Sequence, residues 1–266
     1  MANRNSSRYW SAATSIYYWF VLILVTIITG LLSLPFIIFR MRHAMHAVGY
    51  YWGRSLTWLA GIQMQVTGRE NLHTDGPVAY IANHQSMVDI IVLYSNLRVP
   101  FAWMAKASLF KIPLFGWAMS AAGYIPVVRD DRRKSLDSLY SAADMVKAGR
   151  SVMIFPEGTR GFPDGTMRQF KKGGFILAKR AGVVIQPITI HGAHRVMPPK
   201  QRGTRVQRIY SGTVHLVFHP PIQPEAYADL SPEELLEQVR EIIEAPLPRL
   251  RSLDEAPRGA DVVAAS

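Results

Sequence analysis

Short apolar runs alternate with longer amphipathic segments over most of the chain. The apolar runs predict buried strands, because each is bounded by turn-forming residues. They lie at 65–66, 78–82, 102–105, 124–127, 151–155, 184–190 and 214–218. Helical periodicity is found at 87–96, 111–121, 134–148, 172–181 and 231–244. Strands that alternate with helices predict an α/β domain whose central sheet is mostly parallel and flanked by helices.

The N-terminal segment has a different pattern, because residues 9–39 contain no charged side chain and no histidine. Residues 16–34, its densest part, would span roughly 28 Å as a helix, which is about one hydrocarbon thickness of a bilayer. Tyr17, Tyr18 and Trp19 form an aromatic cluster that suits a membrane interface. This segment therefore predicts a helical membrane anchor.

The topology of this anchor is open. Basic residues flank the apolar segment on both sides, so the positive-inside rule does not choose an orientation. Gly30 and Pro35 could break the segment into two helices that enter and leave the bilayer on the same side. A spanning helix and a re-entrant helix pair are both consistent with the pattern.

The length of 266 residues suits one sizeable domain with an appendage. We predict an anchor and an amphipathic helix over residues 1–64, and one α/β domain over 65–250. Residues 251–266 are small, charged and aperiodic, which predicts a disordered tail. The chain contains no cysteine, which excludes a disulfide framework, a thiolate zinc site and a cysteine nucleophile.

The formal net charge is +11, and most of it is concentrated in one segment. Residues 160–208, the basic band, hold eleven Lys and Arg but only one acid, Asp164. Such a band attracts nucleic acid, anionic membrane or phosphorylated small molecules, unless it is simply a solvated loop. The apolar anchor and the few aromatic residues of the band favour a membrane over nucleic acid.

One chemistry-bearing stretch is "NHQSMVD", residues 83–89. Two side chains five positions apart on one helix would point about 140° away from each other. His84 and Asp89 can meet, however, if His84 lies in the turn after a strand and Asp89 lies in the first helical turns. The carboxylate would then bind one ring nitrogen and leave the other as a base. Asn83 and Ser86 are natural turn and cap residues.

Three further stretches follow strands or form them. "FPEGTR" (155–160) places Thr159 and Arg160, a hydroxyl and a guanidinium suited to phosphate, at a strand end. "GYIPVVR" (123–129) is a short strand that ends in arginine, and "VVIQPITI" (183–190) is a buried strand with a central proline.

In this order, Asn-His-x4-Asp, Gly-x-Ile-x-x-x-Arg, Phe-Pro-Glu-Gly-Thr-Arg and a proline-containing strand resemble the glycerolipid acyltransferases. The resemblance is closest to 1-acyl-sn-glycerol-3-phosphate acyltransferases, and "FKKGGFILA" (170–178) adds to it. It covers about residues 65–220. One difference is Gly161, where a serine is frequent in the family.

The resemblance implies the glycerolipid acyltransferase fold and an enzyme of phospholipid biosynthesis. Such an enzyme transfers a fatty acyl group from acyl-CoA or acyl-carrier protein to the sn-2 hydroxyl of 1-acyl-glycerol-3-phosphate, and the product is phosphatidate. His84 would be the general base, and Asp89 would orient it. Direct transfer is favoured over an acyl-enzyme, because Ser86 is equally well explained as a cap. No metal and no cofactor are expected.

The same resemblance assigns substrate binding to Arg129, Glu157, Gly158, Thr159 and Arg160, which would hold the phosphate and glycerol of the acceptor. The expected partners are a lysophospholipid, an acyl donor, an anionic membrane surface and, as a candidate, acyl-carrier protein, but no nucleic acid. The expected location is the inner, cytoplasmic membrane, with the catalytic domain facing the cytoplasm.

Alternatives remain at this point. The same His/Asp pair would serve glycerol-3-phosphate, another lysophospholipid or a lyso-aminolipid as acceptor. A non-catalytic membrane-surface binding protein is the alternative from another class. Lys106 either borders the site or is a lysine that reaches out to solvent. The His191/His194 and His215/His219 pairs have spacings that metals use, but no carboxylate accompanies them.

Overall fold

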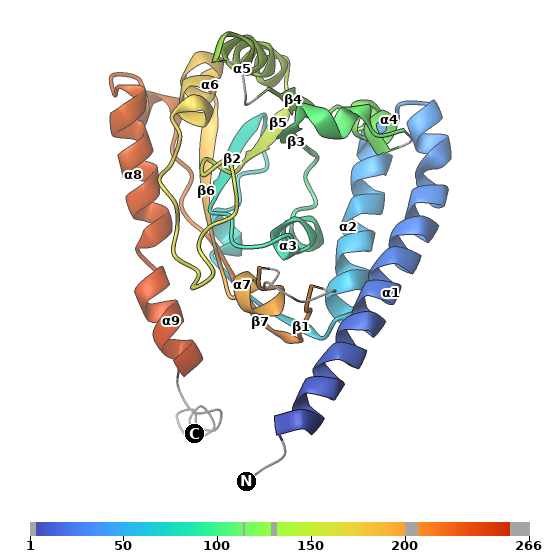
Figure 1. Cartoon of the computed structure of the whole chain (residues 1–266). Coiled ribbons are helices and arrows are strands. Elements are labelled where there is room, and N and C mark those ends of the chain that lie inside the picture. The colour runs from blue at the N-terminus through green and yellow to red at the C-terminus, as the bar shows by residue number, and fades with distance from the viewer. Residues whose placement is uncertain (1–3, 114, 129–131, 200–206, 256–266) are drawn as a thin grey trace.

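The structure is a computed structural model, and it describes residues 4–113, 115–128, 132–199 and 207–255. Among these residues the chain forms a seven-stranded sheet with helices on both faces (Figure 1). The strands are β1 (Ile62–Thr67), β2 (Val78–Ala82), β3 (Phe101–Lys106), β4 (Ile125–Val127), β5 (Ser151–Ile154), β6 (Val184–His191) and β7 (Gly212–Phe218).

The order of the strands across the sheet is β1-β7-β6-β2-β5-β3-β4. All neighbouring pairs are parallel except β6 and β7, so the predicted mostly parallel sheet is confirmed. Ile81 near the end of β2 pairs with Ile154 at the end of β5. The loops that follow these two strands therefore leave the sheet side by side, at the edge where open α/β sheets bind their ligands.

The α-helices among the described residues are longer on average at the N-terminus than in the α/β domain. They are α1 (Arg4–Ile38), α2 (Arg42–Leu59), α3 (Val88–Asn96), α4 (Phe115–Ala121), α5 (Arg132–Lys147), α6 (Gly173–Ala181), α7 (Ala193–Val196), α8 (Pro232–Glu244) and α9 (Leu247–Glu255). Short 3-10 turns lie at η1 (Arg69–Asn71), η2 (Ala107–Lys111) and η3 (Pro224–Tyr227).

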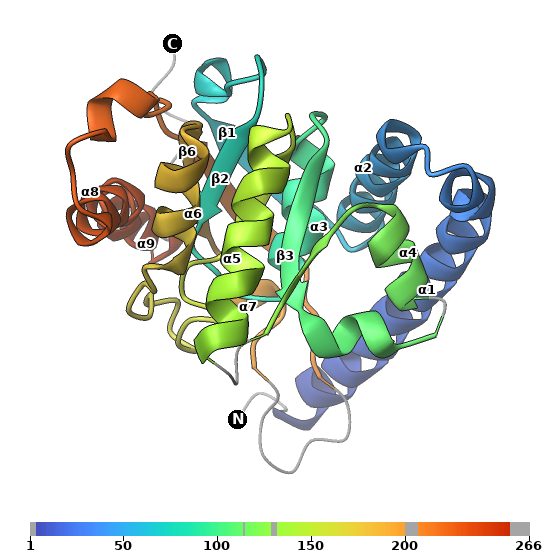
Figure 2. The ribbon, with the colours of Figure 1, turned by 90° about the horizontal axis from the view of Figure 1, so that it is seen from above.

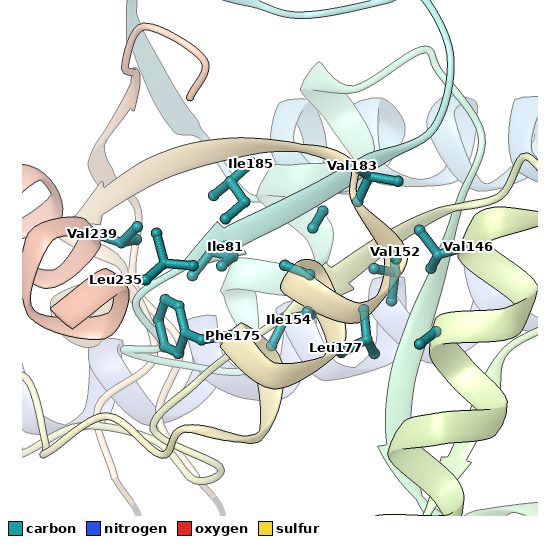
Figure 3. Packing of buried hydrophobic residues seen from close by; sticks show 14 of the residues in the cluster. Ile81, Val146, Val152, Ile154, Phe175, Leu177, Val183, Ile185, Leu235 and Val239 are labelled. Atoms are coloured by element: carbon teal, nitrogen blue, oxygen red, sulfur yellow. The ribbon is translucent and has the colours of Figure 1, made fainter. Parts of the chain in front are cut away.

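The hydrophobic core has two parts, one on each face of the sheet, because successive strand residues point to opposite faces. On one face α5, α6 and α8 cover the sheet, and Figure 3 shows this packing. Its labelled members are Ile81, Val146, Val152, Ile154, Phe175, Leu177, Val183, Ile185, Leu235 and Val239. On the other face Tyr80, Trp103 and Ile188 pack with α3. A sheet buried on both faces explains why its strands are continuous apolar runs.

Three predicted boundaries differ from the structure. β1 begins at Ile62, before the expected domain start at 65, because it is an edge strand in which polar glutamines alternate with apolar residues. The helix expected over 111–121 is divided into η2 and α4. The tail expected to be disordered from 251 is helical as far as Glu255, since α9 continues α8 after a short turn; residues 256–266 lie outside the described residues.

The N-terminal apolar segment and the amphipathic segment after it form an antiparallel helix pair, α1 and α2 (Figures 1 and 2). Within α1, Thr14–Ile38 is long and apolar enough to cross a membrane by length and composition. Neither Gly30 nor Pro35 breaks this helix. The chain reverses later, at residues 39–41, where Arg40 adopts a positive φ of 51°.

The pair contacts the α/β domain through the start of α1 and through α2. Near the start of α1, the Trp19 indole N–H donates to the Gln207 carbonyl at 2.8 Å, and the Ile209 N–H donates to the Ser15 hydroxyl at 3.2 Å. α2 packs closely on α3, because a Cβ atom at Gly53 would lie only 2.8 Å from the Ile91 carbonyl oxygen. Small residues at such a contact allow two helices to approach.

We predict that Gly53→Ala destabilises the protein, because the added methyl group would force α2 away from α3. Thermal unfolding in detergent should show a lowered midpoint. Gly30→Ala is the matched control, since a Cβ atom at Gly30 meets no atom within 4 Å and alanine is the better helix former. Equal effects of the two changes would contradict the close α2–α3 contact.

Candidate functional site

The site begins at the loop after β2, which hydrogen bonds from its own side chains hold to neighbouring segments. The Asn83 amide group donates to the Ile190 carbonyl at 2.9 Å and accepts from the Ile190 N–H at 2.7 Å. It therefore binds this loop to the end of β6 and does not cap α3. The Ser86 hydroxyl is buried and donates to the Met197 carbonyl at 2.9 Å, which holds the loop from the other side.

His84 and Asp89 meet in the geometry that their spacing predicts. His84 lies in the loop, Asp89 lies in the first turn of α3, and His84 Nδ1 is 2.7 Å from Asp89 Oδ2. The same oxygen accepts the N–H groups of Gln85 at 2.6 Å and Ser86 at 2.8 Å. Asp89 is completely buried. The carboxylate thus holds both the ring and the backbone that carries it.

The imidazole is held on its face as well as at its edge. The Phe155 ring, just after β5, stacks on it with 4.1 Å between ring centroids and 10° between ring planes. Within the described part of the chain, Nε2 of His84 has no hydrogen-bond partner, and the side chain is 16 % exposed. An imidazole with Nδ1 bound to a carboxylate and Nε2 available is suited to act as a general base.

Glu157 joins the loop after β2 to the loop after β5. Its Oε1 accepts the His84 backbone N–H at 2.8 Å, and its Oε2 accepts the Arg168 backbone N–H at 2.7 Å. The Gly161 N–H donates to the His84 carbonyl at 2.6 Å. Burial raises the pKa of the Glu157 carboxyl, and the two N–H donors partly offset the rise. Glu157 is buried and its carboxylate holds the two loops together, and its expected contact with the acceptor stays a prediction.

A cavity of about 1280 Å³ opens beside His84. Its walls come from β3, α4, the loop after β5 and the inner faces of α1 and α2. Near His84 the walls carry Lys106, Arg160 and Lys171, whereas no Asp or Glu is found among the described residues that line the cavity. This part of the wall is therefore suited to an anionic ligand, and the apolar remainder is suited to a hydrocarbon chain.

The other expected binding residues have different positions. Gly158, Thr159 and Arg160 line the cavity, and the two side chains are exposed. Gly158 has a positive φ of 68°, which favours glycine there. Arg129 lies outside the described residues. Lys171 was not assigned a role from the sequence, although it belongs to the "FKKGGFILA" stretch; only the fold shows that it borders the cavity.

The basic band does not form a single face. Arg160 and Lys171 line the cavity, but Lys179 of α6 donates to the carbonyls of Tyr227, Ala228 and Leu230 near α8. Figures 1 and 2 both place α6 and α8 on the side of the molecule away from α1. Lys200, Arg202 and Arg205 lie outside the described residues.

Comparison with known proteins shows similarity over most of the chain. The sequence model of the Acyltransferase family matches residues 63–191. A 1-acyl-sn-glycerol-3-phosphate acyltransferase from Pseudomonas aeruginosa is 32 % identical over 233 residues, which cover 83 % of this chain and 86 % of that protein. One from Chlamydomonas reinhardtii is 38 % identical over 208 residues, which cover 78 % of this chain and 59 % of that protein. The chain spans about half to three-fifths of the length of the plant and algal relatives.

A solved structure is also similar. The crystal structure of the 1-acyl-sn-glycerophosphate (LPA) acyltransferase from Thermotoga maritima matches with a TM-score of 0.77 and 26 % sequence identity. The match covers 92 % of this chain and 98 % of that one, so it includes the α1–α2 pair as well as the α/β domain.

We predict that Glu157→Gln lowers the free energy of unfolding at neutral pH by about 1–3 kcal/mol, because the amide cannot accept both backbone N–H groups. Chemical denaturation with Glu233→Gln as control tests this, since Glu233 is an exposed partner of Lys172.

The difference between wild type and Glu157→Gln should also depend on pH. The folded-state pKa of Glu157 is raised, so the cost of burying its charge is present at neutral pH and lessens as the pH falls through that pKa. Wild type should therefore gain stability relative to the variant on acidification. A difference that stays constant across this range would contradict the buried, ionised carboxylate.

Proposed function

Because the chain belongs to the acyltransferase family, we propose that it transfers a fatty acyl group to the sn-2 hydroxyl of 1-acyl-glycerol-3-phosphate and so makes phosphatidate. The observation that carries the proposal is the His84 ring, which is bound to Asp89 through Nδ1 and borders the cavity. The names of the similar proteins support this acceptor.

In the proposed reaction His84 Nε2 takes the proton of the acceptor hydroxyl as that oxygen attacks the thioester carbonyl carbon. The tetrahedral intermediate collapses, the carbon–sulfur bond breaks, and the proton passes from the imidazolium to the leaving thiolate. The products are the new ester and the free thiol. No acyl-enzyme is needed, and the buried Ser86 hydroxyl, which donates to Met197, favours direct transfer.

The acceptor's phosphate is proposed to lie against Arg160, Lys171 and Lys106, cations of the cavity wall that lie at the end of β3 or after β5. From the family resemblance of its sequence motif, Arg129 is proposed to bind the same phosphate. The guanidinium of Arg160 offers paired donors to phosphate oxygens, and its carbonyl is held by Arg168 Nε at 2.9 Å. The donor is acyl-CoA or acyl-carrier protein, and no metal or cofactor is required by this chemistry.

The apolar outer face of α1 supports a place on the membrane. Ile16, Phe20, Leu31 and Ile38 are among its exposed large side chains. Since α1 contacts the domain near its start and α2 packs on α3, a helix pair perpendicular to the bilayer would draw the polar domain into hydrocarbon. We propose that the pair lies in the cytoplasmic leaflet of the inner membrane and that the α/β domain faces the cytoplasm.

We predict that Asp89→Asn lowers kcat/KM for acyl transfer by about 10⁴-fold, as the corresponding Asp→Asn change does in serine proteases, because the amide favours the wrong imidazole tautomer. His84→Ala should lower it by at least about 10²-fold. Asp75→Asn, an exposed aspartate outside the site, is the control. Full activity of Asp89→Asn would refute the assigned roles.

The acceptor is tested with a panel that holds lysophosphatidate, glycerol-3-phosphate, a neutral lysophospholipid and a lyso-aminolipid, each with acyl-CoA and with acyl-carrier protein. Lysophosphatidate should be the best acceptor. Turnover of only an acceptor without a phosphate monoester would contradict the proposed phosphate contacts. Activity with one donor alone identifies that donor.

The membrane topology can be tested by labelling, because the chain has no native cysteine. Ser6→Cys, ahead of the apolar segment, should react with an impermeant maleimide only after the inner membrane is permeabilised. Ser252→Cys on α9 reports the side on which the domain lies. Labelling of Ser6→Cys, but not of Ser252→Cys, in intact spheroplasts would show a spanning helix.

A further inference from the structure

Two arginines meet at a point on the cavity wall that the proposed reaction does not use. Arg42 is the first residue of α2, and Arg150 immediately precedes β5. A Cβ atom at Gly123 would lie 3.1 Å from Arg150 Nη1 and 3.3 Å from Arg42 Nε, so the two guanidinium groups flank the same point. All three residues line the cavity.

This point is well separated from His84. His84 and Phe155 follow the ends of the parallel strands β2 and β5, whereas Arg150 precedes β5. At about 3.3 Å per strand residue, Arg150 and Phe155, which flank β5, are roughly 16 Å apart along the strand. A phosphate bound by Arg160 and Lys171 next to His84 therefore does not reach the Arg42/Arg150 pair.

The positive charge of the pair is uncompensated within the described part of the chain. No carboxylate there lies within 4.0 Å of either guanidinium group. The side-chain contacts of Arg150 are with neutral groups, the Gly123 carbonyl at 3.4 Å and Met145 Sδ at 3.7 Å. Burial, and then the charge of Arg42, lower the pKa of Arg150. A bound anion would relieve this repulsion.

The surroundings add to the positive potential and indicate its ligand. α2 has 18 residues, no acidic residue in its first turn and no side-chain cap, so its dipole favours an anion at Arg42. Phe39, in the turn between α1 and α2, is 74 % exposed, and Trp117 of α4 is 69 % exposed. Figures 1 and 2 place α4 beside the end of the helix pair where these residues lie.

We propose that Arg42 and Arg150 form a second anion site, which binds the phosphate group of an anionic membrane phospholipid at the end of the cavity away from His84. Guanidinium groups bind phosphate oxygens with paired hydrogen bonds, and the exposed aromatic side chains accommodate the adjoining acyl chains. The phosphates of the acyl donor offer the same chemistry. Binding of the donor's phosphates would depend on the proposed function, whereas binding of a membrane lipid would not.

The first arm of the test measures binding to vesicles without substrates. Vesicles of phosphatidylcholine are compared with vesicles that also contain phosphatidylglycerol. Arg42→Gln and Arg150→Gln should each weaken binding to the mixed vesicles about 5-fold and leave binding to phosphatidylcholine unchanged. Arg54→Gln is the matched control, because Arg54 is an exposed arginine of α2 that does not line the cavity.

The second arm measures KM for acyl-CoA and for an acyl-pantetheine that lacks the nucleotide. If the donor's phosphates occupy the site, the Gln variants raise KM for acyl-CoA alone. Arg42→Lys and Arg150→Lys keep the charge but not the paired hydrogen bonds and should restore part of the binding in either arm, which separates loss of an anion contact from misfolding.

The outcomes are distinct. Weaker binding to mixed vesicles identifies a lipid phosphate, and a raised KM for acyl-CoA identifies the donor. Gln variants that match wild type in both arms, or an equal loss in Arg54→Gln, would overturn the proposal. The vesicle measurement tests the anion site even if the protein transfers no acyl group. Failure of the proposed function would therefore be recognised separately from failure of the anion site.

Discussion

A single carboxylate oxygen, Oδ2 of Asp89, accepts hydrogen bonds from the His84 ring and from the backbone N–H groups of Gln85 and Ser86. Since Asp89 is completely buried, its charge needs these donors, and the conformation of the loop supplies them. The orientation of the imidazole is thereby coupled to the fold of the loop. Glu157 fixes the backbone in the same way. Its two carboxylate oxygens accept the backbone N–H groups of His84 and Arg168 and so join the loops after β2 and β5.

The cavity extends from this rigid centre to the α1–α2 helix pair. Lys106, Arg160 and Lys171, the apolar side chains of β3 and α4, and the Arg42/Arg150 pair all line it, and the position of Arg150 before β5 separates this pair from His84. Such a sequence of charged and apolar walls suits a phospholipid, in which a phosphate adjoins long acyl chains. Residues of α1 and α2 line this cavity, so the helices that are proposed to meet the lipid also form a wall of the proposed reaction chamber.

The apolar runs predicted the strands well because a sheet buried on both faces has few polar positions; the glutamines of edge strand β1 concealed its first residues. The His84–Asp89 contact could be predicted because a turn and one helical turn determine it locally. The role of Glu157 could not, since its partners are backbone N–H groups that every sequence has. Arg42 and Arg150 are far apart in the sequence, and only the tertiary fold brings both side chains next to Gly123.

The central claim is that Asp89 holds His84 with the proton on Nδ1 and leaves Nε2 as a base. The most direct measurement is the ¹⁵N NMR spectrum of histidine-labelled protein at a pH where the ring is neutral, with His84 assigned by its absence in His84→Ala. The account predicts a protonated Nδ1 and an unprotonated Nε2. A neutral His84 with its proton on Nε2 would contradict it.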